Sequence, residues 1–292
     1  MKKIILLSLV AFITAGLLSY KNKSNLNDVL SSESYIACYT TDSRNEIQAD
    51  ALKPGFAALH PNPTPFTLQD AKGEMINFSA ADGTTASAYY IKSKKKSNKW
   101  LFVIQEWWGL NDNIKREADE FSNELNNVNI LAIDMYDGKV ATTRDSAMKY
   151  MSGAKTERLT TIVNAAIAYA GQKAKIYTVG WCFGGAWSLQ ASLLAGKQAN
   201  GCIMYYGRPE NKVEKLSTLQ CDVIGFFGTQ DKGIPMNLVD EFEKNLTTLG
   251  KKITIHKYDA GHGFANPSNP VFNKQATEDA HAKAITFLKE RM

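Results

Sequence analysis

The chain has 292 residues, of which 44% are hydrophobic and 22% are charged, and its formal net charge is +5. This length suffices for one sizeable hydrophobic core, arranged as one domain or two. The excess of basic residues is small and no basic stripe alternates with aromatic residues, which argues against nucleic-acid binding. The lysine run 94–96 is interpreted as a solvated loop between two strands, and an anionic docking patch is the less favoured alternative.

The first residues have the layout of a secretory signal peptide. Met1, Lys2 and Lys3 form a short positive segment, and residues 4–18 are almost wholly apolar with small residues near their end. The apolar segment is short for a membrane-spanning helix, which needs about 20 residues. We therefore expect residues 1–20 to be a signal peptide and the mature protein to be periplasmic or secreted, without stable membrane contact. An uncleaved N-terminal anchor is the alternative, and the cleavage site is not determined.

Residues 21–72 are expected to form an irregular N-terminal tail. They contain clusters of asparagine, serine and aspartate, followed by prolines at positions 54, 61, 63 and 65. Cys38 lies in this tail, too far from the apolar segment to resemble a lipid-attachment site convincingly.

From residue 73 onward, strand-like segments alternate with amphipathic helical segments. The expected strands are 74–79, 86–91, 100–105, 129–134, 175–180, 201–206, 222–227 and 253–258. Helical stripes are centred on 114–125, 159–170, 238–249 and 280–288. Several strands are apolar at consecutive positions, which is typical of strands covered on both faces. Two strands followed by alternating strands and helices predict one catalytic domain over residues 73–292, an α/β fold with a mostly parallel eight-stranded sheet and helices on both faces.

The sharpest motif is Gly180-Trp181-Cys182-Phe183-Gly184, which follows the fifth strand and precedes a helical segment. This is the nucleophile elbow of the α/β-hydrolase fold, with cysteine in place of serine. The turn presents the nucleophile above the sheet, and glycines two residues before and after it avoid a collision. A helix N-terminus beside the sulfur favours the thiolate. The alternative is a tight turn with an inert buried cysteine.

A thiol nucleophile needs a base and a group that orients the base. His262 follows the eighth strand between two glycines and is the expected base, with a purely structural loop histidine as the alternative. Asp231 follows the seventh strand, which gives the order nucleophile, acid, histidine that α/β-hydrolases require. Asp134 and Asp137, after the fourth strand, are the rival acids.

The loop after the third strand begins with a carboxylate, Glu106, directly after an apolar run. A carboxylate directly after an apolar strand packs poorly unless it has a function, and Glu106 could hydrogen-bond the thiol of Cys182 or accept its proton. Pairing with an arginine or capping of the next helix is the alternative. This loop supplies one oxyanion-binding amide in α/β-hydrolases, expected here from Trp107, and the amide of Phe183 supplies the other.

Four motifs together resemble the dienelactone hydrolase family. They are QEWWGLN (105–111), GWCFGG (180–185), YYG (205–207) and GHGF (261–264), in order over roughly residues 73–292. The resemblance implies a hydrolase of carboxylic esters or lactones, carboxymethylenebutenolidase in its type reaction, with no metal and no cofactor. It matches the family's Cys–Asp–His triad to Cys182, Asp231 and His262, and its thiol-activating glutamate to Glu106.

Two positions depart from the family pattern. Family members that act on the acidic lactone bind its carboxylate with arginines, and one of these positions holds Asn266 here. The other lies in the loop after the fourth strand, where Lys139 could substitute only as a point charge. We therefore expect a small-molecule ester or lactone that is less anionic. The expected pocket adds five aromatic residues, Trp107, Trp108, Tyr136, Tyr206 and Phe264.

The leading hypothesis is hydrolysis through an acyl-thioester on Cys182 by a monomer. One alternative is a non-catalytic binding protein of the same fold, which the presence of all three triad residues disfavours. Another is a thiol-redox protein, which would need a resolving cysteine near the elbow, and the sequence has none there. Cys202 and Cys221 are expected to be buried free cysteines, with a bridge between them as the alternative.

Overall fold

The expected strands form one sheet in the computed structural model, which describes residues 42–53 and 55–292. The strands are β1 (Glu74–Ser79), β2 (Thr85–Ile91), β3 (Lys99–Ile104), β4 (Asn129–Ile133), β5 (Lys175–Trp181), β6 (Ala199–Tyr205), β7 (Val223–Gly228) and β8 (Ile253–Tyr258). Their order is β1-β2-β4-β3-β5-β6-β7-β8. β1 pairs antiparallel with β2 and β2 with β4, and every other pairing is parallel. The mostly parallel eight-stranded sheet is therefore confirmed.

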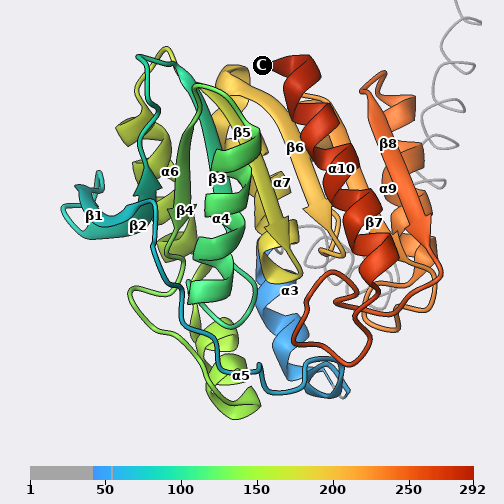
Figure 1. Cartoon of the computed structure of the whole chain (residues 1–292). Coiled ribbons are helices and arrows are strands. Elements are labelled where there is room, and N and C mark those ends of the chain that lie inside the picture. The colour runs from blue at the N-terminus through green and yellow to red at the C-terminus, as the bar shows by residue number, and fades with distance from the viewer. Residues whose placement is uncertain (1–41, 54) are drawn as a thin grey trace, which may run out of the picture. The chain divides into compact units, whose positions relative to one another are not determined.

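Helices cover both faces of this sheet (Figure 1). They are α3 (Arg44–Ala49), α4 (Asp112–Glu124), α5 (Arg144–Gly153), α6 (Thr156–Ala170), α7 (Phe183–Ala195), α8 (Val213–Ser217), α9 (Met236–Thr248) and α10 (Lys274–Arg291). Short 3-10 turns are η1 (Asp50–Leu52), η2 (Ala57–Leu59) and η3 (Gly196–Gln198). In Figure 1, α4 and α10 lie in front of the sheet and α6 and α7 behind it. The four predicted helical stripes correspond to α4, α6, α9 and α10.

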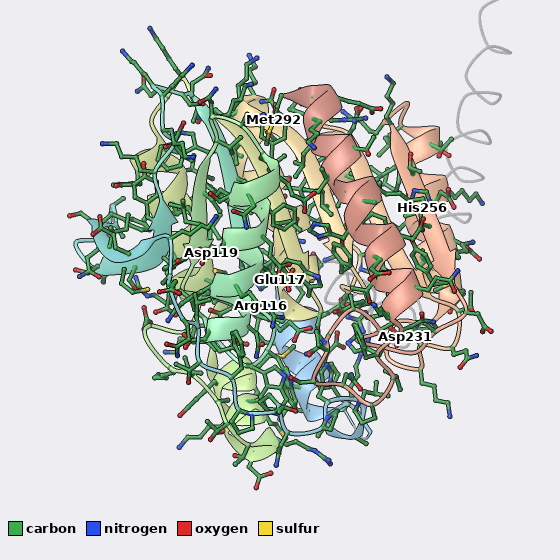
Figure 2. All side chains as sticks on the ribbon, viewed as in Figure 1. Arg116, Glu117, Asp119, Asp231, His256 and Met292 are labelled. Atoms are coloured by element: carbon green, nitrogen blue, oxygen red, sulfur yellow. The ribbon has the colours of Figure 1, made fainter. Side chains whose placement is uncertain are left out.

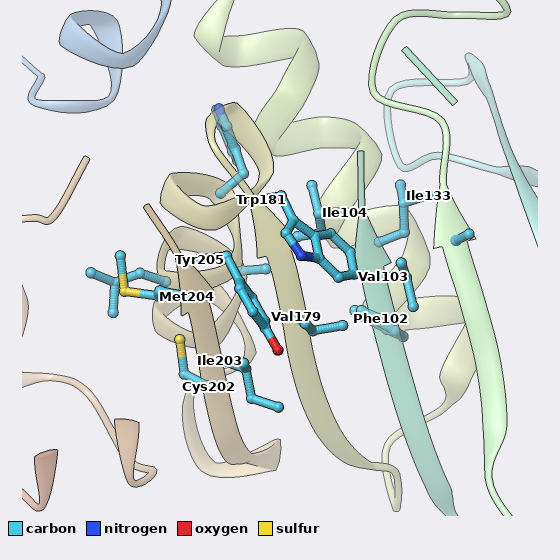
Figure 3. Packing of buried hydrophobic residues seen from close by; sticks show 14 of the residues in the cluster. Phe102, Val103, Ile104, Ile133, Val179, Trp181, Cys202, Ile203, Met204 and Tyr205 are labelled. Carbon is cyan, nitrogen blue, oxygen red and sulfur yellow. The ribbon is translucent and has the colours of Figure 1, made fainter. Parts of the chain in front are cut away.

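The centre of the sheet is apolar on both faces. Every residue of β4 and β7 is buried. Ile104 of β3 lies beside Ile133 of β4, and Val103 lies beside Val179 of β5, as Figure 3 shows. This two-sided burial explains the consecutive apolar positions in the sequence. Because the carboxyl ends of parallel strands meet at one edge, the loops after β3, β5, β7 and β8 come together there.

Residues 43–60 differ from the expected irregular tail. They form α3, η1 and η2, and the side chains of Ile47, Ala51 and Phe56 are buried in the core. Asp50 accepts two hydrogen bonds from the guanidinium of Arg208, at 2.5 and 2.7 Å. The compact unit that contains the sheet begins at Ser43, whereas the expected catalytic domain begins at residue 73. Three widely spaced apolar side chains of this segment are buried, which is too few to show a helical period among its polar residues.

Other expectations concern the N-terminus and the cysteines. The expected signal peptide, the first part of the expected tail and Cys38 lie outside the described residues. Within residues 42–53 and 55–292, none of the helices has the length and apolar character needed to cross a membrane. Cys202 and Cys221 are both buried free thiols, so they are not bridged to each other.

Candidate active site

Cys182 occupies the sharp junction between β5 and α7. Its backbone has φ 53° and ψ −115°, a strained conformation for a residue with a side chain. A Cβ added at Gly180 would lie 2.2 Å from the carbonyl oxygen of Gly184. A Cβ added at Gly184 would lie 2.2 Å from the carbonyl oxygen of Ile104, at the end of β3. Both glycines are therefore sterically required, as the elbow motif predicts, and the second one joins the elbow to the loop that carries Glu106.

His262 connects the thiol to a carboxylate. Its Nε2 lies 3.3 Å from Sγ of Cys182, and its Nδ1 lies 2.6 Å from Oδ2 of Asp231. The other oxygen of Asp231 accepts hydrogen bonds from the backbone amides of Gly233 and Ile234, at 2.7 and 2.9 Å. Those amides hold the carboxylate in place, so it can fix the orientation and tautomer of the imidazole. Figure 2 shows Asp231 in the loops beyond the strand ends, away from His256 on β8.

The rival acids make other contacts. Asp134 accepts hydrogen bonds from the side chain of Ser87 and from the backbone amide of Tyr136 at 3.0 Å. Asp137 forms an ion pair with Arg158 at 2.6 Å. Asp231 is therefore the acid that the fold brings to His262.

Burial and charge act in opposite directions on the thiol and the imidazole. Burial raises the pKa of the Cys182 thiol, and attraction to His262 partly offsets this rise. For His262, burial alone would lower the pKa, but the neighbouring Cys182 and Asp231 outweigh it and raise the pKa well above 6.5. The imidazole is therefore suited to accept the thiol proton and to hold it.

Glu106 is buried beside this pair. Its Oε2 accepts a hydrogen bond from the side-chain amide of Asn266 at 2.7 Å, and its Oε1 accepts one from the hydroxyl of Tyr206 at 3.3 Å. Burial raises the pKa of Glu106 to about 7. The expected hydrogen bond from the Cys182 thiol to Glu106 is not present in the described structure, but the negative charge of Glu106 still raises the pKa of the thiol. Asn266, expected only in place of an arginine, thus holds Glu106.

Of the two expected oxyanion residues, Phe183 contacts the sulfur directly. A hydrogen bond from the backbone amide of Phe183 helps to lower the pKa of Cys182. Trp107 follows Glu106 and its side chain is fully buried. The indole nitrogen of Trp107 has no hydrogen-bond partner among the described residues.

The expected pocket residues do not all line the same hollow. Trp108, Tyr206 and Asn266 line one hollow together with Glu106. Lys139 lines a different hollow, beside Tyr136 and Arg158.

The remaining aromatic residues of the expected pocket are part of the packing around the site. Phe264 is fully buried, and its ring centroid lies 5.4 Å from that of Tyr206. Tyr136 is buried with its ring centroid 5.3 Å from that of Phe183, and its hydroxyl has no partner among the residues described. Tyr136 therefore brings an unsatisfied donor close to the elbow.

A second histidine contacts the thiol, and the sequence did not predict it. Nε2 of His60 lies 3.3 Å from Sγ of Cys182, and its Nδ1 lies 2.9 Å from the carbonyl oxygen of Phe56. The His60 ring packs against Trp107, with centroids 4.5 Å apart. Burial, reinforced by repulsion from His262, lowers the pKa of His60 to about 3. The available signal was weak: an apolar run, 56–59, directly before the histidine in a segment otherwise rich in proline.

Comparisons with known proteins agree with this geometry. The family model described as "Dienelactone hydrolase family" matches residues 86–292. A carboxymethylenebutenolidase of a Pseudomonas species is 31% identical over 136 residues, covering 44% of this chain and 54% of that protein. Carboxymethylenebutenolidase 1 of Cupriavidus pinatubonensis is 25% identical over 231 residues, covering 73% of this chain and 95% of that protein.

Solved structures share the fold. A dienelactone hydrolase-like promiscuous phosphotriesterase from metagenomic libraries has a TM-score of 0.63 at 19% identity, covering 75% of this chain and 99% of that one. A Pyrococcus furiosus esterase has a TM-score of 0.59 at 14% identity, covering 80% of this chain and 100% of that one. The fold is that of the α/β-hydrolases. Because the family model spans well over half of the sequence, the chain belongs to the dienelactone hydrolase family.

Proposed function

We propose that the chain hydrolyses carboxylic esters or lactones, with Cys182 as nucleophile, His262 as base and acid, and Asp231 as the orienting group. One observation carries the proposal: a single imidazole contacts both the sulfur, at 3.3 Å, and a carboxylate, at 2.6 Å. This is the geometry of a nucleophile, a base and an orienting acid. It lies on a strained strand-to-helix turn in a chain of the dienelactone hydrolase family.

In the first half-reaction, Nε2 of His262 takes the thiol proton and the sulfur attacks the carbonyl carbon of the substrate. His262 rather than His60 accepts the proton, because the pKa of His262 is raised well above 6.5 whereas that of His60 is lowered to about 3. The amides of Phe183 and Trp107 stabilise the negative oxygen that forms. When the tetrahedral intermediate collapses, the carbon–oxygen bond of the leaving group breaks and His262 protonates the departing alkoxide.

In the second half-reaction, water attacks the acyl-thioester. His262 accepts a proton from the water, and the resulting tetrahedral intermediate releases the carboxylic acid product and the sulfur. The sulfur takes the proton back from His262, which restores the starting state. Glu106 adjusts this cycle through its charge: neutral Glu106 removes a negative neighbour from the sulfur and so favours the thiolate.

The proposed substrate is an ester or lactone with an uncharged acyl part. The side-chain amide of Asn266 is occupied by Glu106, and Lys139 lines a separate hollow. Neither position therefore offers a cation to a substrate carboxylate near the sulfur. An enzyme of this kind should hydrolyse a neutral lactone faster than the corresponding lactone that carries a carboxylate.

The test is an assay on a panel of activated esters and lactones, neutral and carboxylate-bearing, with the wild type, Cys182→Ala and Glu106→Gln. Loss of the nucleophile should lower kcat/KM by at least about 10⁴-fold. The His281→Asn variant is a matched control, because His281 lies on α10 and pairs with Glu124. Equal activity of the wild type and Cys182→Ala across the panel would exclude this function.

We also propose that the mature chain is exported and acts as a monomer. Export is supported by the positive and then apolar N-terminal sequence of residues 1–18. Cell fractionation with N-terminal sequencing of the mature protein tests export, and light scattering tests the monomer. A mature chain that begins at Met1 in the cytoplasm would contradict export, and a stable dimer would contradict the second proposal.

A further inference from the structure

Three electron-pair donors converge in the buried site. They are Sγ of Cys182 and the Nε2 atoms of His60 and His262, each nitrogen 3.3 Å from the sulfur. The three ligand atoms lie within 4.8 Å of one another, and all three side chains are buried. The segment that contributes His60 is anchored to the domain through Phe56, whose ring centroid lies 5.3 Å from that of Trp107.

The hydrogen-bond partner of each Nδ1 determines whether the Nε2 atom that faces the sulfur carries a proton or a lone pair. Nδ1 of His60 contacts the carbonyl oxygen of Phe56, which can only accept a hydrogen bond. Nδ1 of His262 contacts the carboxylate of Asp231, which when ionised also only accepts. Each Nδ1 therefore carries the proton of its neutral ring, and each Nε2 presents its lone pair to the sulfur.

The thiol has one proton for these two acceptors. If the thiol proton points toward His262, the lone pair of His60 faces a sulfur lone pair at 3.3 Å. If the proton points toward His60, the lone pair of His262 faces a sulfur lone pair at the same distance. Transfer of the proton to His262 makes the contact with His60 worse, because the sulfur is then an anion. Protonation of His60 would also relieve the contact, but it would bury a positive charge beside His262, whose ring centroid lies 4.9 Å away. A bound cation would accept lone pairs from all three ligand atoms at once.

We propose that His60, Cys182 and His262 form a zinc-binding site, and that bound Zn²⁺ reversibly blocks the nucleophile. The block of the nucleophile rests on the proposed function, whereas zinc binding itself does not. Two imidazoles and one thiolate are a donor set that suits Zn²⁺. Zinc-binding histidines donate their second N–H to a carbonyl or a carboxylate, and both of these outer contacts are already present here, to Phe56 and Asp231. The fourth position of the metal is left for water.

Binding would form one Zn–S bond and two Zn–N bonds and would release the thiol proton to solvent. Zinc affinity should therefore increase with pH. The bound ion would occupy the sulfur lone pair that attacks the substrate and the Nε2 lone pair that accepts the proton. Chelation of the metal would restore both groups, so the block is reversible.

The first test is calorimetric titration of the full, metal-stripped chain with Zn²⁺, beside His60→Asn and His281→Asn. The asparagine amide at position 60 can still donate to the Phe56 carbonyl but lacks the Nε2 ligand. We expect one Zn²⁺ to bind per wild-type chain. In His60→Asn the zinc affinity should fall by more than the roughly 10–100-fold that loss of an outer-shell contact costs, because a direct ligand is lost. His281→Asn should match the wild type. Absence of binding to the wild type, or equal affinity in His60→Asn, would overturn the proposal.

The second test needs no variant of His60. Co²⁺ bound to the wild type should show a thiolate-to-metal charge-transfer absorption that is missing in Cys182→Ser. Zn²⁺ should slow alkylation of Cys182 by iodoacetamide, and a chelator should restore it. No charge-transfer absorption and unprotected alkylation would overturn the site.

If zinc binds in this way while the wild type hydrolyses none of the panel, the proposed function fails and the metal site stands. If esters are hydrolysed equally with and without saturating Zn²⁺, the block is overturned.

Discussion

In the proposed mechanism, Asp231 determines how the proton moves between Cys182 and His262. Its carboxylate accepts from Nδ1 of His262 on one oxygen and is held by two backbone amides on the other. The His262 tautomer that exposes a free Nε2 lone pair to the thiol depends on this contact. A change that keeps the size of the side chain but makes it neutral therefore isolates the orienting role.

Asp231→Asn should keep the fold and lose activity. The asparagine amide can donate to His262 and so favours the wrong tautomer, and in a serine triad the equivalent change costs about 10⁴-fold in kcat. Steady-state kinetics on an activated ester measures the loss, and far-UV circular dichroism checks the fold. A variant with native dichroism and less than a tenfold loss of kcat would show that Asp231 does not orient the base.

Glu106 should make stability depend on pH. Its pKa is raised by burial from 4.5 to about 7, so the folded state binds the proton more tightly than the unfolded state does. The associated stability is present below pH 4.5 and is lost as the pH rises to about 7, by roughly 3 kcal/mol. Glu106→Gln lacks this titration. In urea unfolding, the free energy of unfolding of Glu106→Gln relative to that of the wild type should be higher at pH 8 than at pH 5. A difference between the two proteins that is equal at both pH values would contradict the assignment.

At the scale of elements, the site depends on how two segments meet the elbow. The β5–α7 junction lies against the end of β3 because Gly184 has no side chain. The segment formed by α3, η1 and η2 brings His60 to the sulfur and is tied to the domain by Arg208 and Asp50. The contact of Gly184 with β3 positions the loop that carries Glu106. The segment of α3, η1 and η2 covers the thiol.

Gly184→Ala should displace the elbow from the β3 loop. The new Cβ would lie 2.2 Å from the carbonyl oxygen of Ile104, and backbone cannot yield as a flexible side chain can. We expect a loss of about 3 kcal/mol in the free energy of unfolding, together with loss of hydrolysis. Gly153→Ala, in α5, is the control, because nothing lies within 4 Å of its added Cβ. Equal stability of the two variants would refute the steric argument.

Asp50→Asn should loosen the segment over the thiol. It removes the carboxylate that faces Arg208, whose side chain is 14% exposed, and should lower stability by roughly 2–3 kcal/mol. Alkylation of Cys182 should become faster as the segment opens more often. Lys53→Ala is the control, because Lys53 pairs with the same carboxylate from an exposed position. Alkylation rates that match in all three proteins would show that the segment does not limit access to Cys182.

In the molecule as a whole, the strands were predictable to within a residue or two, and the central strands most clearly, because burial on both faces leaves consecutive apolar residues. β4 and β7 are the clearest examples. Helices α5 and α8 were not predicted, because α8 has only five residues and α5 buries only Ala147 and Met151. Short or weakly amphipathic helices owe their stability to tertiary contacts rather than to their own periodicity.

The proximity of Cys182, His262 and Asp231 was predictable because each residue follows a strand, and the fold brings the ends of parallel strands together. His60 was not, because it belongs to no strand and reaches the sulfur only through the packing of Phe56 and the Asp50–Arg208 ion pair. The contacts of Glu106 with Asn266 and Tyr206 also lay outside the sequence pattern, since they join residues about 100 or more positions apart.

In the proposed reaction, Cys182 carries the acyl group during turnover. Rapid mixing of the full chain with an activated ester, acid quenching and mass measurement of the intact protein test it directly. We expect a gain of one acyl mass that maps to the peptide containing Cys182 and that is absent in Cys182→Ala. An acyl group on a different residue, or turnover that continues in Cys182→Ala, would contradict it.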